Sequence, residues 1–174
     1  RTVLVSDRTA PVITLSGETT VNHELGTLYT DAGATATDSV DSSVPVTTSG
    51  EVDVNTSGTY TLTYNASDAA DNAATPVTRT VLVSDRTAPV ITLLGEASVS
   101  HQVGTPYTDA GATASDSVDG SVSVTTSGEV DVNTSGTYTL TYNASDAAGN
   151  AATPVTRTVL VSDRTAPVIT LSGE

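Results

Sequence analysis

Aspartate residues at fixed intervals are the feature of this sequence best suited to chemistry. An Asp-x-x-Asp pair, Asp38 and Asp41, returns 78 residues later, and Asp7 returns twice at the same interval. Carboxylates that lie within a few ångströms of one another repel strongly unless a positive charge sits among them. We therefore predict a metal site. The candidate ligands are Asp7, Asp38, Asp41, Asp68, Asp85, Asp116, Asp119, Asp146 and Asp163.

The ligand types favour Ca²⁺. The chain has no cysteine and only two histidines, so zinc and copper lack their usual ligands. A cation that takes six to eight oxygen ligands in irregular geometry suits carboxylates and carbonyls on flexible loops, and this favours calcium over magnesium. The spacing is not that of an EF-hand. Two alternatives stay open: Arg8, Arg86 or Arg164 could neutralise the neighbouring carboxylates, or the aspartates could simply cap turns.

Composition excludes several classes of partner. The 174 residues carry a formal charge of −14, with six Arg and no Lys. Nucleic acids and anionic membranes both attract clustered positive charge, so we expect neither nucleic-acid binding nor direct membrane contact. Hydrophobic content is 37%, without Phe, Trp, Met or Cys. A core this thin needs a stabilising cross-link, and without cysteine a bound metal is the leading candidate.

An internal repeat of 78 residues organises the chain. The phrase DRTAPVITL begins at Asp7 and again at Asp85, and residues 7–84 differ from residues 85–162 at only 11 positions. We expect the end of one repeat at 1–6, whole repeats at 7–84 and 85–162, and the start of another at 163–174. Such near-identity favours a structural role, because copying a unit multiplies length more usefully than it multiplies a catalytic site.

Alternating polar and apolar residues predict strands. In the first repeat these cover 11–15, 20–25, 32–37, 44–48, 59–67 and 77–83, with a brief strand inside residues 49–58. Arg79 is expected at the rim of its strand, and Asp31 is expected to fix a turn. About seven short strands with turn signals and no helical period predict an all-β fold of tandem antiparallel β-sandwiches.

The phrase GTYTLTY adds detail to this fold. Tyr60 and Tyr138 each lie two residues before an inward-facing leucine, Leu62 or Leu140. This is the position of the tyrosine corner in immunoglobulin-like sandwiches. In that topology the incoming linker, the loop DSVDSS at 38–43 and the loop SDAADN at 67–72 lie at one end. The aspartates of one repeat are therefore expected to converge there.

Several phrases together resemble a known family. YTDAGATA, DSVDG, GTYTLTY and SDAAGN, in this order, resemble the bacterial immunoglobulin-like repeats of giant secreted adhesins of the RTX type. A similar repeat occurs in some pesticidal crystal proteins. The resemblance implies the sandwich fold, an extracellular or cell-surface location, and calcium between repeats. The first repeat departs from it at Ser42 and Asp71, where the second has Gly120 and Gly149, which puts the geometry of its loops in question.

We therefore expect a structural extender, a spacer module of a long bacterial surface adhesin stiffened by calcium, whose partners are neighbouring repeats of the same chain. The alternative is a carbohydrate- or protein-binding module. Binding modules usually display exposed aromatic residues or divergent loops, and this chain has six Tyr as its only aromatics. Neither an enzymatic activity nor a small-molecule substrate is expected.

Overall fold

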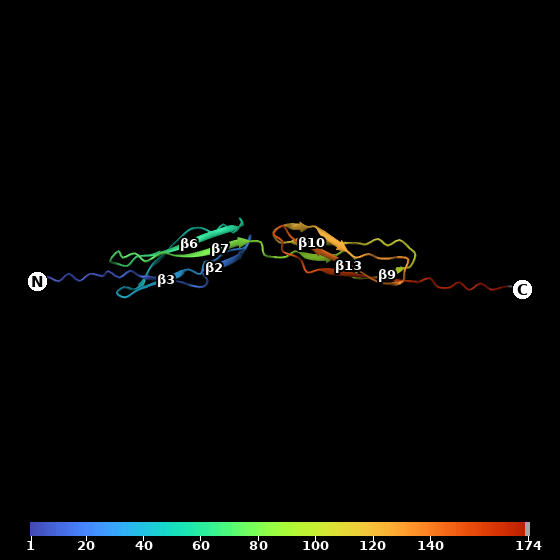
Figure 1. Cartoon of the computed structure of the whole chain (residues 1–174), viewed down its shortest axis with the longest axis horizontal. Helices are drawn as coiled ribbons and strands as arrows, with labels where there is room; N and C mark the ends of the chain where they lie inside the picture. The colour runs from blue at the N-terminus through green and yellow to red at the C-terminus, as the bar shows by residue number, and fades with distance from the viewer. Residues whose placement is uncertain (173–174) are drawn as a thin grey trace. The chain divides into compact units, whose positions relative to one another are not determined.

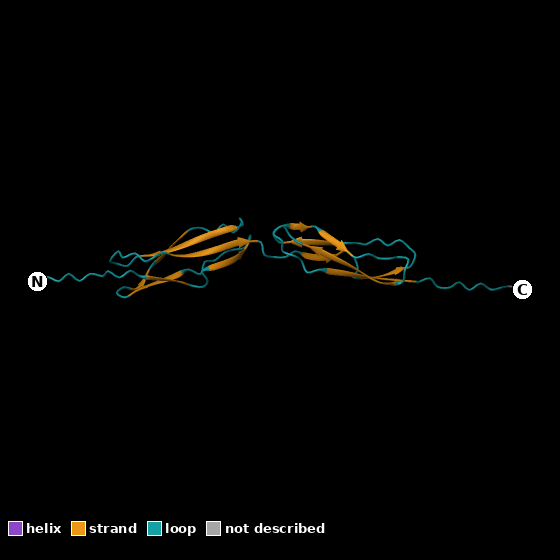
Figure 2. Cartoon of the chain, in the orientation of Figure 1, coloured by secondary structure: helices purple, strands orange, loops and turns teal. Residues whose placement is uncertain are grey.

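The computed structural model describes residues 1–172, which form strands and loops without a helix (Figure 2). No helix among them is long and apolar enough to cross a membrane. The chain divides into two compact units, Arg1–Arg86 and Thr87–Glu174, and residues 173–174 of the expected last segment, 163–174, lie outside the described residues.

Each unit is a sandwich of two sheets built from seven strands (Figure 1). The strands of the first unit are β1 (Val12–Leu15), β2 (Thr20–Glu24), β3 (Ala34–Asp38), β4 (Ser42–Val44), β5 (Val46–Ser49), β6 (Gly58–Ala66) and β7 (Val77–Ser84). One sheet has the order β1-β3-β4, and the other has the order β2-β7-β6-β5. The predicted β-sandwich is confirmed.

The second unit repeats this plan. Its strands are β8 (Val90–Leu93), β9 (Ser98–Gln102), β10 (Ala112–Asp116), β11 (Gly120–Val122), β12 (Val124–Ser127), β13 (Gly136–Ala144) and β14 (Val155–Ser162). Its sheets have the orders β8-β10-β11 and β9-β14-β13-β12. In each unit one pair departs from the antiparallel pattern, because β2 runs parallel to β7 and β9 runs parallel to β14.

The chain changes sheets in the middle of a segment that the sequence predicts as one strand. Residues 44–48 divide at Pro45, so that β4 pairs with β3 while β5 pairs with β6 in the other sheet. Proline has no N–H for a ladder, yet Ser123 occupies the same break in the second unit. The break therefore follows from the crossing between sheets rather than from proline alone. The brief strand expected inside residues 49–58 is absent, because only Ser49, the end of β5, and Gly58, the start of β6, belong to strands.

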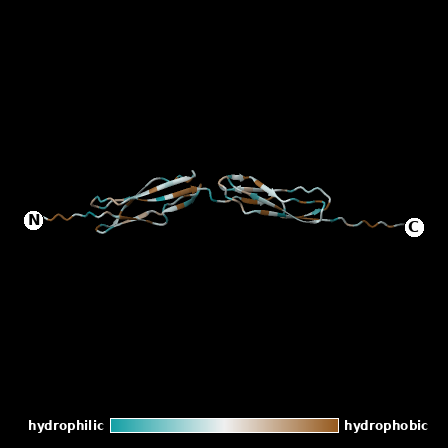
Figure 3. Ribbon diagram, in the orientation of Figure 1, coloured by the Kyte–Doolittle hydropathy of each residue, from teal (hydrophilic) through white to brown (hydrophobic). Residues whose placement is uncertain are grey.

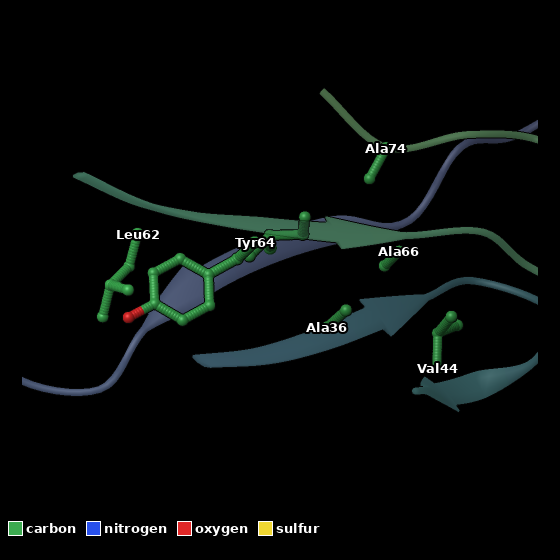
Figure 4. Close-up of a cluster of buried hydrophobic side chains, with 7 residues drawn as sticks. Ala36, Val44, Leu62, Tyr64, Ala66 and Ala74 are labelled. Atoms are coloured by element: carbon green, nitrogen blue, oxygen red, sulfur yellow. The ribbon is translucent and has the colours of Figure 1, made fainter. Parts of the chain in front are cut away.

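The core of the first unit lies between the sheets and is small. Figure 4 shows Leu62, Tyr64 and Ala66 of β6 facing Ala36 of β3 and Val44 of β4. These positions alternate along β6, as the period-2 pattern predicts. Hydrophobic residues outside the sandwich, such as Val3, Leu4 and Val5, belong to the N-terminal segment and are exposed (Figure 3).

The tyrosine corner forms as predicted. The Tyr60 hydroxyl donates to the carbonyl of Thr56 at 2.8 Å, and Tyr138 does the same to Thr134 at 2.8 Å. Each hydroxyl thus bonds to the backbone four residues upstream, at the start of a central strand. This contact fixes the connection between β5 and β6 in the first unit.

A buried arginine joins the two sheets. Arg79 on β7 is only 1% exposed, so the expectation that it lies at the rim is wrong. Its guanidinium pairs with Asp31 and donates to the backbone carbonyls of Glu18 at 3.0 Å and Gly33 at 3.3 Å. The Tyr64 hydroxyl donates to Asp31 at 2.8 Å. Arg157, Asp109 and Tyr142 repeat the arrangement in the second unit.

We call the contacts among Arg79, Asp31 and Tyr64 the arginine brace. Asp31 holds the brace together through an ion pair and hydrogen bonds. It accepts the Gly33 N–H at 3.1 Å, so the predicted turn is present. Burial alone would raise the pKa of Asp31, but the hydrogen bonds from Tyr64 and Arg79 and the charge of Arg79 outweigh it and lower this pKa below 3.8. Burial, followed by the hydrogen bond to Asp31, raises the pKa of Tyr64 to about 12. The brace supplies a polar cross-link in a domain without cysteine.

Candidate metal site

Four carboxylates of the first repeat converge as predicted. Asp7, Asp38, Asp41 and Asp68 each offer one oxygen, and these oxygens all lie within 4.8 Å of one another. They come from the linker before β1, the end of β3 with the turn that follows it, and the loop between β6 and β7. Three segments that are far apart in sequence thus bring their negative groups to one end of the sandwich.

Asp7 uses its two oxygens differently. Its Oδ1 accepts the N–H of Thr9 at 2.9 Å, a contact that turns the linker just before β1. Its Oδ2 is buried and has no hydrogen-bond partner. Because buried polar atoms are nearly always satisfied, this oxygen needs a partner that the protein itself does not supply.

Asp38 shows the same division. Its Oδ1 accepts the N–H groups of Val40 at 2.7 Å and Asp41 at 3.3 Å, and its Oδ2 is buried without a hydrogen-bond partner. The hydrogen bond from the Val40 N–H is the main reason that the pKa of Asp38 lies below 3.8. Burial acts in the opposite direction, and the N–H groups of Asp41 and Ser39 lower the pKa further. The residue therefore carries a full negative charge at neutral pH.

Asp41 and Asp68 connect the two loops. The Oδ2 of Asp41 accepts the N–H of Ala69 at 2.9 Å, which ties the β3–β4 turn to the β6–β7 loop. Asp68 is 7% exposed and organises its own loop, because its Oδ1 accepts the N–H of Asn72 at 2.8 Å and its Oδ2 accepts the Asn72 side-chain amide at 2.7 Å. These bonds fix the loops without consuming the free oxygens of Asp7 and Asp38.

The departures at Ser42 and Asp71 leave the loop geometry intact. Ser42 has φ +62° and Asp71 has φ +65°, while Gly120 and Gly149 have φ +71° and +91° at the same places. Non-glycine residues rarely adopt this left-handed conformation. The first repeat therefore keeps the backbone of the second at the expense of local strain.

Arginine does not neutralise the carboxylates of the first repeat. Among residues 1–172, Arg8 makes no ion pair with Asp7, Asp38, Asp41 or Asp68, and its side chain instead donates to Ser6 at 3.5 Å. The ordinary turn role is present in these aspartates, since each accepts backbone N–H groups. It does not account for the two oxygens that lack partners. The donor set of four carboxylates and two unsatisfied oxygens fits a hard cation such as calcium.

The second repeat keeps most of these contacts. Asp116 and Asp119 come together, with the Asp119 N–H donating to Asp116 at 3.1 Å, and Asp119 accepts the Ala147 N–H at 2.7 Å. The Oδ2 of Asp116 is again buried without a hydrogen-bond partner. Asp146 organises its loop through Asn150 at 2.7 Å but does not come as close to this pair as Asp68 does to its counterparts.

The remaining candidates lie on linkers. Asp85 follows β7 and belongs to the first unit, whereas Asp163 follows β14 and belongs to the second. The Oδ1 of Asp163 accepts the Thr165 N–H at 2.9 Å, as Asp7 does with Thr9. The Thr165 N–H, followed by the side chain of Gln102, lowers the pKa of Asp163 below 3.8. Asp7 and Asp163 therefore each turn their own linker through one carboxylate oxygen.

Sequence reasoning missed the arginine brace. The signal was present in the alternation of β7, where Arg79 shares its parity with the inward-facing Val77, Val81 and Val83. An arginine at an inward position of a strand indicates a buried partner of opposite charge. Asp31, assigned only to a turn, is that partner.

Comparisons with known proteins find solved structures of low similarity and one matching family. Two of the solved structures that match are a lipoprotein of Bacteroides thetaiotaomicron, 17% identical with a TM-score of 0.39, and fibronectin(III)-like modules of CbhA from Clostridium thermocellum, 20% identical with a TM-score of 0.40. The alignments cover 84% and 92% of this chain and 99% and 100% of those chains, respectively. Among curated proteins, no sequence matches.

The family comparison is more specific than these structures. The family described as "Bacterial surface protein, Ig-like domain" matches residues 13–83 and again residues 91–161. The two matches together span most of the chain and fall one on each sandwich. The chain therefore belongs to the bacterial surface protein Ig-like domain family, of which it carries two tandem copies.

Proposed function

We propose that this chain is an extender segment of a long bacterial surface adhesin, and that calcium binds where each linker meets the repeat that follows it. The observation that carries the proposal is the group of four carboxylate oxygens within 4.8 Å, from Asp7, Asp38, Asp41 and Asp68. Two of these residues, Asp7 and Asp38, also have a buried oxygen without a hydrogen-bond partner.

The electrostatics of the group support a bound divalent cation. Four carboxylates this close repel one another, and Arg8 does not pair with them. One Ca²⁺ would offset half of their charge and would accept oxygens from all three segments, with carbonyls or water completing its shell. Asp7 and Asp38 would supply the oxygens that have no other partner, while Asp41 and Asp68 would add theirs beside existing bonds to backbone N–H groups.

Stiffness is the mechanical consequence. Asp7 belongs to the linker, whereas the other three belong to the sandwich: Asp38 ends β3, and Asp41 and Asp68 lie on loops. An ion shared among them would prevent the linker from swinging relative to its repeat. Since Asp85 and Asp163 occupy the same place in later copies, every linker would be held in the same way, and each repeat would add a fixed length.

The near-identity of the copies supports an extender over a binding module. Only 11 of 78 positions differ, and the tyrosines are engaged within the fold, with Tyr64 and Tyr142 fully buried. The abundance of calcium outside cells would allow weak sites, with Kd on the order of 10⁻⁴–10⁻³ M, to be filled. An extracellular position at the cell surface follows.

Calcium-dependent melting tests the proposal. At calcium concentrations of about 100 times Kd, stabilisation of about 2.7 kcal/mol is expected relative to protein in chelator. Asp7→Asn combined with Asp38→Asn should abolish this stabilisation in the first repeat. Glu51→Gln, which removes one exposed carboxylate outside the group, should leave it unchanged.

Small-angle scattering in calcium and in chelator, at equal ionic strength, tests stiffness. The wild-type chain should become more flexible when calcium is removed. A melting temperature and a scattering profile that do not respond to calcium would overturn the proposal. A reproducible hit on a glycan array would instead favour the carbohydrate-binding alternative.

A further inference from the structure

One side chain at the end of β2, and its counterpart at the end of β9, holds the linker that leaves each repeat. Both oxygens of the Glu24 carboxylate accept the backbone N–H of Arg86, at 3.1 and 3.3 Å. In the second repeat the side-chain oxygen of Gln102 accepts the backbone N–H of Arg164 at 2.6 Å. The bond spans 62 residues of sequence in both cases.

The parallel pairing of β2 with β7 creates this contact. Glu24 lies in register with Ser84, the last residue of β7, and the next N–H along, that of Leu25, donates to the Ser84 carbonyl at 3.1 Å. The ladder stops there. The side chain of Glu24 then reaches the N–H of Arg86, two residues beyond the end of β7, and so extends the order of the sheet into the linker.

The contact persists although the residue changes. Position 24 is one of the 11 differences between the copies, with Glu in the first and Gln in the second, and both side chains accept the same N–H. Glutamate and glutamine have the same length and both offer an oxygen acceptor. What the two copies share is therefore the acceptor, not the charge.

The two side chains differ in what else they can do. Gln102 also donates its amide N–H to the Oδ1 of Asp163 at 3.3 Å, and so orients the linker aspartate. An ionised carboxylate has acceptors only, so Glu24 has no proton to donate to Asp85. It instead adds a negative charge beside the residue that follows Asp85.

We propose that Glu24 and Gln102 are positioning residues that fix the start of each outgoing linker, and that the exchange of Glu for Gln makes the first linker more dependent on calcium than the second. The second part rests on the proposed function, because it takes Asp85 and Asp163 as calcium ligands. An extra negative charge near a ligand attracts a divalent cation and, without the cation, repels the ligand.

Hydrogen exchange tests the positioning role without reference to calcium. Glu24→Ala should speed exchange of the Arg86 amide by about tenfold, the effect of losing one hydrogen bond to a charged group. Glu24→Gln should keep it protected, because the acceptor remains. Glu18→Gln serves as the matched control, since Glu18 is an exposed glutamate of the same repeat. Unchanged exchange in Glu24→Ala would overturn the positioning role.

Calcium titration tests the charge. Glu24→Gln should weaken calcium binding a few-fold, because it removes one negative charge beside the linker that carries Asp85, and salt screens this effect. It should also reduce the difference in Arg86 amide motion, measured by ¹⁵N relaxation, between calcium and chelator. Equal calcium responses in Glu24→Gln and wild type would overturn the second part of the proposal.

The two arms separate this inference from the proposed function. If the chain binds calcium but Glu24→Ala leaves the exchange rate of the Arg86 amide unchanged, the proposed function stands and the positioning role fails. If the chain does not bind calcium at all, the proposed function and the calcium dependence of the linkers fail together. The exchange of the Arg86 amide would still decide whether Glu24 holds the linker.

Discussion

Replacing the arginine of the arginine brace in one repeat should destabilise that repeat alone. In Arg79→Met, the unbranched methionine fills part of the space, but Asp31 loses its ion pair. The carbonyls of Glu18 and Gly33 lose a donor as well. Breaking a buried pair by removing one partner costs about 3–5 kcal/mol. A domain of this size is stable by roughly 4–12 kcal/mol, so a large part of its stability depends on one side chain.

Differential scanning calorimetry can measure this loss against an internal reference. The second repeat retains Arg157 and its partners, so only the transition of the first repeat should move. For a domain of 60–100 residues, each kcal/mol shifts Tm by about 4–8 °C, and a loss of about 3 kcal/mol predicts a fall of about 12–24 °C. Thr78→Val, at an exposed position next to Arg79 on β7, is the matched control. A shift below about 4 °C in Arg79→Met would refute the view that the brace cross-links the sheets.

Two further predictions concern strain and acid. Ser42→Gly should stabilise the first repeat by about 0.5–1 kcal/mol. Serine pays a steric penalty at φ +62°, whereas glycine does not, and this penalty exceeds the extra backbone entropy that glycine loses on folding. A lower urea midpoint than wild type would contradict this. The folded-state pKa of Asp31 lies below 3.8, so its contribution to stability is present above the unfolded pKa and is lost as pH falls through the folded pKa. Urea midpoints should therefore drop below about pH 4, and an NMR titration of the Asp31 carboxyl should give a midpoint below 3.8; a midpoint above 3.8 would show that burial outweighs Tyr64 and Arg79.

Much of the fold could be predicted because it depends on local pattern. The alternation along residues 59–67 predicts that Leu62 and Tyr64 face the core, whichever strands lie beside them. This follows because successive side chains of a strand point to opposite faces. The position of Tyr60 relative to Leu62 was enough to predict the tyrosine corner. The convergence of Asp7, Asp38 and Asp68 also followed, because the sandwich topology brings their three segments to one end.

Other features depend on which segments meet and could not be predicted from pattern. The parallel pairing of β2 with β7 leaves no periodic trace, yet it places Glu24 against the linker. The change of sheet at Pro45 lies within a segment, residues 44–48, that the sequence predicts as one strand. In both cases the partner strand, not the segment's own sequence, decides the geometry.

The sequence alone therefore determined the repeat, the strand periodicity and the set of aspartates, because each is written in residue types at short range or at a fixed interval. Only the tertiary structure decided that Arg79 is buried beside Asp31, and that Asp7 and Asp38 each keep one oxygen without a partner. Burial and hydrogen-bond satisfaction are properties of atoms brought together from distant segments, and no single segment carries them.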